Sequence, residues 1–483
     1  MKSMQADRMS LARELIRPAA VLALSSGLMM AATFVGKAVL ARVISVEEYG
    51  GYVLLLTVVA SAGALCTLGL PEAVARAIAV ARTDRIKVRT IMGQSLAWAS
   101  FCALACAAAL ALLGNVLVGR QTKVFFFALM LASLPMSALI DISSGVLRGL
   151  EQFFRKALLD LAKPLIFLAG IILASTWHQS GLSVPVFSYV AGAGITAVVG
   201  LGFVFANGSP ISVAFPTELF RYGLPLTAGA LAGVVMGSFD TLFLGVTFGT
   251  LPVASYAAAM SLASLVGIVA GSFDNVFLPR CAYLLGHKRF DELSRTYRFA
   301  INASVLLNYP LVFVLIAWAG EVLQLTFGAQ YRSAALLLQI LALSNYLNSL
   351  LGPNHAGVKA LGRSDISLRA SLLIIGLKVV LGVLLIPYYG AAGAAAAYFV
   401  SQLGFNVYLR LSLKKLCGSL TMSGQNVLVS VLVIVSVAFS SVLGSTTSFT
   451  LIKIAAFALP FLPFLRGFRD VPAALAHKPV TAE

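Results

Sequence analysis

Long apolar runs recur along the whole chain and are separated by short polar or basic connections. Each run holds roughly 20 residues, the length that an α-helix needs to cross a bilayer, and the alternating pattern of a membrane barrel is absent from the sequence. The pattern therefore predicts fourteen transmembrane helices, at residues 18–41, 50–71, 91–114, 124–147, 157–176, 184–206, 222–245, 252–275, 299–320, 334–355, 366–387, 390–409, 425–444 and 449–465.

Composition agrees with this pattern. Of the 483 residues, 59% are hydrophobic and only 11% are charged, and the apolar residues are spread over the chain instead of marking one or two anchors. Such a balance is typical of an all-α polytopic membrane protein and excludes a soluble globular domain.

The basic residues indicate the orientation. When the N-terminus is placed in the cytoplasm, 27 of the 35 lysines and arginines fall in the N-terminal segment, the inner connections and the C-terminal tail. The outer connections hold four, and the other four are lysines inside spans. The positive-inside rule therefore predicts that both termini are cytoplasmic. Because the net charge of +17 is spread over many short loops, nucleic-acid binding is not expected.

The second half of the chain repeats features of the first half in the same order. At offsets of 203, 204 and 208 residues, Lys37, Tyr52 and Leu70-Pro71 correspond to Asp240, Tyr256 and Leu278-Pro279. Lys163 corresponds to Lys378 at an offset of 215. Parallel repeats of this kind commonly enclose a central substrate site in transporters.

The repeat predicts two pseudo-symmetric six-helix lobes followed by a helix pair. The expected segments are a cytoplasmic N-terminal segment at 1–17, an N-lobe at 18–206, an inter-lobe linker at 207–221, a C-lobe at 222–409, two further helices at 425–465 and a cytoplasmic tail at 466–483.

Charges inside the apolar runs are the candidate site residues. Lys378 lies about midway along the run 366–387, where an ammonium group facing lipid is costly, so it is expected to face a polar cavity and an anionic ligand. Lys163 in the first repeat lies nearer the inner end of its span, where snorkelling to the headgroups is an equal alternative. Lys453, near an outer boundary, is expected to be an anchor.

Two further charges belong to the same hypothesis. Lys37 is near the outer end of its span but shares a helical face with Ser26 and Thr33, which favours a polar lumen. Asp240 is expected to neutralise Lys37 or to titrate during transport, which would couple the protein to a proton or sodium gradient.

Other chemistry-bearing residues have simpler interpretations. Asp141 and Asp274 lie close to cytoplasmic span ends and are expected to pair with basic loops, and His355 is expected to form hydrogen bonds at a helix end. The cysteines Cys102 and Cys106 share a helix face but have no His or carboxylate near them in sequence. No catalytic residues, metal ligands, cofactor site or nucleotide-binding loop is predicted.

Short motifs resemble a known family. The run from Ala41 to Gly50 (ARVISVEEYG), the run from Leu68 to Ala73 (LGLPEA) and Arg76 resemble the opening of Wzx-type oligosaccharide flippases of the multidrug/oligosaccharidyl-lipid/polysaccharide superfamily. In the second half, Asp240 and the run from Val253 to Ala259 (VASYAAA) are similar to the same family.

This resemblance implies a two-lobed transporter that moves undecaprenyl-diphosphate-linked oligosaccharide from the cytoplasmic to the periplasmic leaflet of a bacterial inner membrane. It also implies that the protein has polysaccharide polymerases and glycosyltransferases as partners. Lys37, Lys163, Lys378 and Asp240 would then bind the substrate. A drug or organic-cation exporter of the same superfamily and a membrane-embedded polysaccharide polymerase or glycosyltransferase remain the alternatives. The longest outer connections are too short and too uncharged to favour the enzyme.

Overall fold

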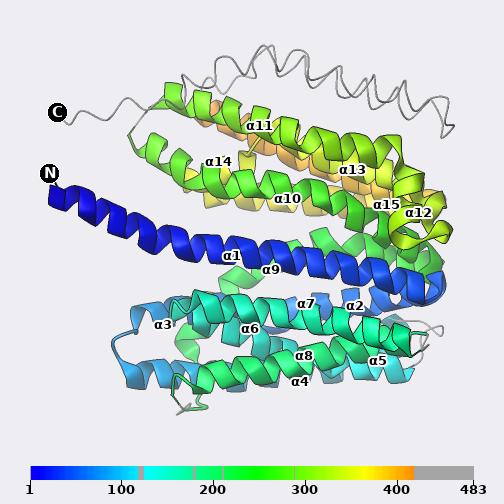
Figure 1. Ribbon diagram of the computed structural model, residues 1–483, viewed down its shortest axis with the longest axis horizontal. Coiled ribbons are helices and arrows are strands. Elements are labelled where there is room, and N and C mark those ends of the chain that lie inside the picture. The colour runs from blue at the N-terminus through cyan, green and yellow to red at the C-terminus, as the bar shows by residue number, and fades with distance from the viewer. Residues whose placement is uncertain (1, 118–123, 178–180, 209–211, 288, 418–483) are drawn as a thin grey trace. The chain divides into compact units, whose positions relative to one another are not determined.

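A computed structural model of the protein describes residues 2–117, 124–177, 181–208, 212–287 and 289–417 (Figure 1). The regular elements of this part of the chain are all helices. Ten helical stretches within it are long and apolar enough to cross a membrane. The predicted spans at 425–444 and 449–465, the tail at 466–483 and Lys453 lie outside the described residues.

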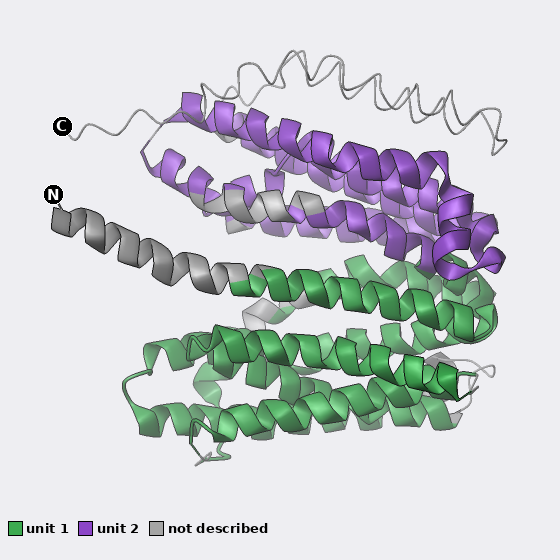
Figure 2. Ribbon diagram, viewed as in Figure 1, with its two compact units in different colours: residues 1–257 green, residues 258–483 purple. Residues whose placement is uncertain are grey.

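The chain divides into two compact units, residues 1–257 and 258–483 (Figure 2). Unit 1 contains α1 (Lys2–Val43), α2 (Val46–Cys66), α3 (Leu70–Val80), α4 (Arg85–Leu117), α5 (Val124–Leu131), α6 (Ser133–Gly149), α7 (Phe153–Thr176), α8 (Ser183–Phe205), α9 (Thr217–Phe248) and the start of α10 (Thr250–Gly286). Unit 2 contains the rest of α10, α11 (Phe290–Ala317), α12 (Ala319–Phe327), the 3-10 helix η1 (Ala329–Ala334), α13 (Ala335–Leu351), α14 (Asn354–Ala360) and α15 (Ser364–Cys417).

Eleven of the first twelve predicted spans fall mainly on one helix each, and the span at 124–147 covers both α5 and α6. The stretch Asp365–Lys415 covers two of them, because the backbone of α15 leaves the helical region at Gly390. The seventh span falls on α9, whose apolar part is Gly233–Phe248. The boundary between the units lies within α10, and the lobes expected at 18–206 and 222–409 stay a prediction.

Two helical hairpins organise the units. In unit 1, α7 packs against α8, and both also contact α6. In unit 2, α15 turns back on itself at Gly390, whose φ of +54° is accessible to glycine at little cost. A Cβ on Gly393 would lie only 2.3 Å from the Leu385 carbonyl oxygen, so the two halves of α15 lie side by side. The second hairpin packs on α13 and α14.

Local sequence signals explain where α2 and α3 begin. Ser45 caps α2: its hydroxyl accepts a hydrogen bond from the Glu48 amide at 3.2 Å, and the Glu48 carboxylate accepts one from the Ser45 amide at 3.2 Å. This reciprocal pair satisfies two amides that the first helical turn leaves open. Gly69, with a φ of +69°, directly precedes α3, and Pro71 lies in the first turn of this helix. Proline is common in a first helical turn, because the amide hydrogen that it lacks would have no partner there.

Within unit 1, α2 and the start of α10 approach each other very closely. At Gly50 an added Cβ would lie 1.9 Å from the Thr250 carbonyl oxygen and 3.2 Å from the Ala254 amide nitrogen. Only a residue without a side chain fits there. Gly50 therefore allows close contact between α2 and the start of α10, which carry residues of two separate sequence motifs, ARVISVEEYG and VASYAAA.

Candidate functional site

Lys163 is held between three helices of unit 1. Its ammonium group donates a hydrogen bond to the Tyr189 hydroxyl of α8 at 3.0 Å and to the Ser137 hydroxyl of α6 at 3.4 Å. The ammonium nitrogen also lies 4.2 Å from the centroid of the Tyr189 ring. Within the described part of the chain, Lys163 has no carboxylate at ion-pair distance. The hydrogen-bond partners of this lysine are thus neutral hydroxyls, and the Asp141 carboxylate of α6 interacts with it electrostatically without forming an ion pair.

Lys378 has a related arrangement in unit 2. Its side chain is buried, with the residue only 2% exposed, and its ammonium nitrogen lies 5.0 Å from the centroid of the Tyr398 ring. The Tyr398 hydroxyl donates to Asn345 Oδ1 of α13 at 3.4 Å and accepts from Gln402 Nε2 at 3.2 Å. Lys378 lies on the first half of α15 and Tyr398 on the second, so the pair spans the hairpin.

Tyr398 begins a row of polar side chains on the second half of α15. The row has a spacing of four residues, which places its members on one helical face. Its members are Tyr398, Gln402, Asn406 and Arg410. They bond to α13 through Asn345, through Asn348 at 2.5 Å from Asn406 and through the Leu351 carbonyl oxygen at 2.9 Å from Arg410.

The corresponding face of α8 differs. At an offset of 209 residues, Tyr189 corresponds to Tyr398, but the following positions hold Ala193, Ala197 and Leu201. Ala193 and Ala197 are buried at 0% and 4% exposure. The lysine and tyrosine are therefore repeated in both hairpins, whereas the polar row belongs to the second hairpin.

Asp240 is buried in unit 1, at 2% exposure on α9. The Tyr256 hydroxyl of α10 donates a hydrogen bond to Asp240 Oδ2 at 2.9 Å. Tyr52, which the predicted repeat matches with Tyr256, stacks instead on Phe167 of α7 with ring centroids 5.8 Å apart. Lys37 is partly buried on α1. Its proposed pairing with Asp240 stays a prediction.

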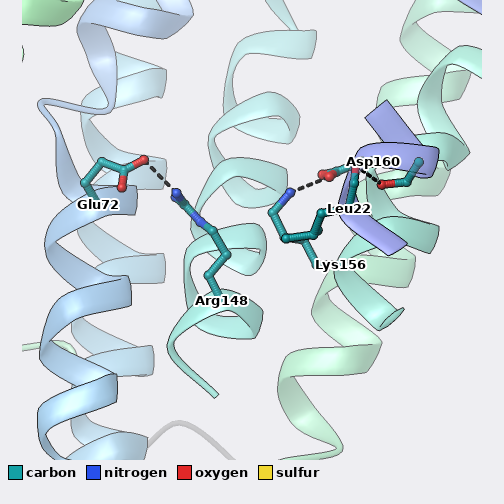
Figure 3. Close-up of polar contacts among 6 residues, drawn as sticks. Leu22, Glu72, Arg148, Lys156 and Asp160 are labelled. Atoms are coloured by element: carbon teal, nitrogen blue, oxygen red, sulfur yellow. Dashed lines mark hydrogen bonds and ion pairs between the residues drawn. The ribbon is translucent and has the colours of Figure 1, made fainter. Parts of the chain in front are cut away.

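Two ion pairs, one between helices and one within a helix, lie at helix ends that the sequence places near the cytoplasm. Arg148 Nη1 of α6 lies 2.8 Å from Glu72 Oε1 of α3, and Lys156 forms an ion pair with Asp160 one turn along α7 (Figure 3). Asp160 lies on α7 between Lys156 and Lys163. The same face of α7 therefore carries alternating charges from its first turns toward Lys163.

The Glu72 pair also explains two of the sequence motifs. A Cβ on Gly145 would lie 2.5 Å from the Pro71 carbonyl oxygen, so α6 packs directly on the backbone of α3 one residue before Glu72. The glycine permits the close approach, and Arg148, three residues later, pairs with Glu72. The motif around Leu70-Pro71 and the one at Gly145 are thus two sides of a single contact.

The sequence-predicted site residues are divided between the units. Lys37, Lys163 and Asp240 belong to unit 1, and Lys378 belongs to unit 2. Sequence reasoning missed Tyr189 and Tyr398, although both recur at nearly the same offset as the lysines. Among the described residues, no group of three or more His, Cys, Asp or Glu side chains is placed to hold a metal ion.

Two curated relatives cover different shares of the chain. A putative O-antigen transporter of Shigella flexneri is 24% identical over 75% of this chain and 88% of its own length. A probable low-salt glycan biosynthesis flippase, Agl15, of Haloferax volcanii is 22% identical over 54% of this chain, which spans only 55% of that relative.

The fold has a solved counterpart. The lipid II flippase MurJ in its inward closed conformation superposes with a TM-score of 0.77 over 93% of this chain and 99% of that chain, at 14% identity. At this identity the likeness establishes the fold and not the substrate.

Family profiles match most of the described chain. The profile of the polysaccharide biosynthesis protein family matches residues 15–284, which is more than half of the sequence, and the MatE profile matches residues 225–384. The resemblance drawn from the short motifs is thereby confirmed. These matches place the protein among multi-pass membrane transporters and not among enzymes. The chain belongs to the polysaccharide biosynthesis protein family.

Proposed function

We propose that this protein is a flippase that moves undecaprenyl-diphosphate-linked oligosaccharide, the repeat unit of an O-antigen, capsule or exopolysaccharide, from the cytoplasmic to the periplasmic leaflet of a bacterial inner membrane. Buried Lys378 is the observation that carries the proposal. A lysine inside an apolar helix is costly unless it serves an anion or a polar cavity, and a lipid diphosphate is such an anion. The relatives named for O-antigen transport and glycan flipping support the same substrate class.

The architecture proposed with this function has two six-helix lobes, 18–206 and 222–409, joined by the linker 207–221 and followed by two helices within 425–465. Alternating access of the lobes would expose one site first to the cytoplasm and then to the periplasm. Lys37, Lys163, Lys378 and Asp240 are the proposed substrate-binding residues. Asp240 is also the proposed point of coupling to a proton or sodium gradient, since its carboxylate is buried and accepts a hydrogen bond from Tyr256.

A transport assay tests the function directly. The purified protein is reconstituted in vesicles that carry fluorophore-labelled undecaprenyl-diphosphate oligosaccharide in both leaflets, and a membrane-impermeant quencher is added outside. We expect the protein to bring inner-leaflet label within reach of the quencher, and Asp240→Asn to remove any acceleration by an imposed proton or sodium gradient.

The controls separate this function from its rivals. A drug exporter, the alternative that the MatE match favours, would move an organic cation such as ethidium and leave the labelled lipid in place. Polymerase or glycosyltransferase activity would instead change the length of the labelled glycan, which gel electrophoresis detects. Vesicles in which the lipid stays protected at every gradient would contradict the proposal.

The proposed orientation places both termini and the connection 280–298 in the cytoplasm, with 177–183 outside. It rests on the excess of basic residues in alternate connections. In a cysteine-free background, we expect His178→Cys to react with an impermeant maleimide in intact cells and the exposed Arg295→Cys to react only after permeabilisation. The reverse labelling pattern would invert the topology and with it the direction of transport.

A further inference from the structure

The two hairpins share one arrangement around their lysines. In each hairpin a lysine on the first helix meets a tyrosine on the returning helix, Lys163 with Tyr189 and Lys378 with Tyr398. The ammonium-to-centroid distances of 4.2 and 5.0 Å are within the range of cation–π attraction. Little else in the two hairpins is repeated, as Ala193 against Gln402 illustrates. The pair is therefore the feature that the two repeats retain.

A neutral aromatic partner has a particular consequence for a lysine inside a membrane. The ring attracts the ammonium group through its quadrupole and leaves the positive charge in place. A carboxylate would also stabilise the ammonium, but it would compete with any phosphate that approached. In the ranges that the structure describes, Lys163 donates its hydrogen bonds to the hydroxyls of Tyr189 and Ser137 and not to a carboxylate.

Each tyrosine is itself fixed. The Tyr398 hydroxyl is held by Asn345 of α13 and Gln402 of its own helix, so the ring is oriented from two sides. The Tyr189 hydroxyl contacts Lys163 directly. The two rings thus contact their lysines in different ways. Tyr398 faces Lys378 with its ring while its hydroxyl bonds to Asn345 and Gln402. Tyr189 contacts Lys163 through both its ring face and its hydroxyl.

We propose that Tyr189 and Tyr398 are positioning residues that hold the ammonium groups of Lys163 and Lys378 for a phosphate group of the lipid-linked substrate. This inference rests on the proposed function. The tyrosines act through the lysines and need not touch the substrate. Replacing either tyrosine should therefore lower the affinity for the diphosphate. A substitution at the lysine that needs no aromatic partner should restore that affinity.

The test measures the affinity of the detergent-purified full-length protein for undecaprenyl diphosphate by microscale thermophoresis. We expect Tyr398→Leu to weaken binding about tenfold, because the ring contact is lost. Tyr398→Phe, which keeps the ring, should bind nearly as wild type, whereas Tyr189→Phe, which loses the hydrogen bond to Lys163, should weaken binding measurably. Tyr389→Leu, at an exposed tyrosine of the same hairpin, is the matched control.

A compensating variant distinguishes positioning from packing. In the Tyr398→Leu background, Lys378→Arg should restore most of the affinity, because a guanidinium keeps its charge without help from the ring. Failure of Lys378→Arg to restore binding would mean that Tyr398 only supports the fold. Wild-type affinity in both Tyr398→Leu and Tyr189→Phe would also overturn the inference. If Tyr398→Leu does not fold, as a thermal melt shows, the Tyr189→Phe result decides. Absence of undecaprenyl diphosphate binding by the wild-type protein would instead contradict the proposed function, and the inference with it.

Discussion

Gly50→Ala is expected to prevent normal packing of unit 1. The new Cβ would lie 1.9 Å from the Thr250 carbonyl oxygen and 2.7 Å from its carbonyl carbon. Both are backbone atoms at the start of α10, so no side-chain rotation relieves the overlap. Overpacking against side chains already costs about 1–3 kcal/mol, and displacing a helix end should cost at least as much. We expect a melting temperature several degrees lower in detergent and a reduced yield of monodisperse protein.

The neighbouring glycine provides the control. A Cβ on Gly51 would meet only the Thr250 methyl group, at 3.8 Å, which is an ordinary van der Waals distance. Gly51→Ala should therefore melt within a degree or so of wild type, although both glycines are buried in the same helix. Equal melting temperatures for the two variants would show that α2 and the start of α10 do not approach each other as described.

Lys378→Ala is expected to slow transport of the labelled lipid at least tenfold in the vesicle assay. The substitution removes a buried ammonium group from the middle of the first half of α15. Charge-assisted hydrogen bonds are worth about 1.5–3 kcal/mol, and 1.4 kcal/mol corresponds to a factor of ten. In cells, surface glycan should decrease while lipid-linked oligosaccharide accumulates on the cytoplasmic face.

Three variants set the limits of this result. Lys378→Arg should keep part of the activity, because it preserves the charge but changes the geometry beside Tyr398. Lys415→Ala, at an exposed position near the end of the same helix, should transport as wild type, and Lys453→Ala, the proposed anchor, should be mild. Normal glycan export by Lys378→Ala at wild-type abundance would remove this lysine from the mechanism. Loss of the protein from the membrane would instead indicate a structural role.

Much of the helical fold follows from apolar runs, because a bilayer demands about 20 such residues per crossing. The short helices α3 and α14 were not predicted, since they lie in basic connections where no apolar run marks them. The break between the spans ending at Pro387 and beginning at Gly390 was predicted, and the structure places the turn at Gly390. Proline and glycine together interrupt an otherwise continuous apolar stretch.

The candidate site was predictable only for its charges. Lys378 and Asp240 are conspicuous because a charge is rare inside an apolar run. A tyrosine is not, so Tyr189 and Tyr398 gave no comparable signal. Their contacts join residues 26 and 20 positions apart across a hairpin, and such pairs depend on how two helices pack. The contact of Gly145 with Pro71 was out of reach for the same reason.

The second helix of each hairpin presents a different surface to its neighbours, polar on α15 and apolar on α8. This difference affects how easily each helix can slide along the helix that it packs against. Tyr398, Asn406 and Arg410 tie α15 to α13 through directional bonds, and sliding one helix along the other would break several of them together. Ala193 and Ala197 give α8 a smooth surface that sliding leaves largely intact. Shear between packed helices therefore meets less resistance in the first hairpin, which makes the two hairpins mechanically different although both carry a lysine–tyrosine pair.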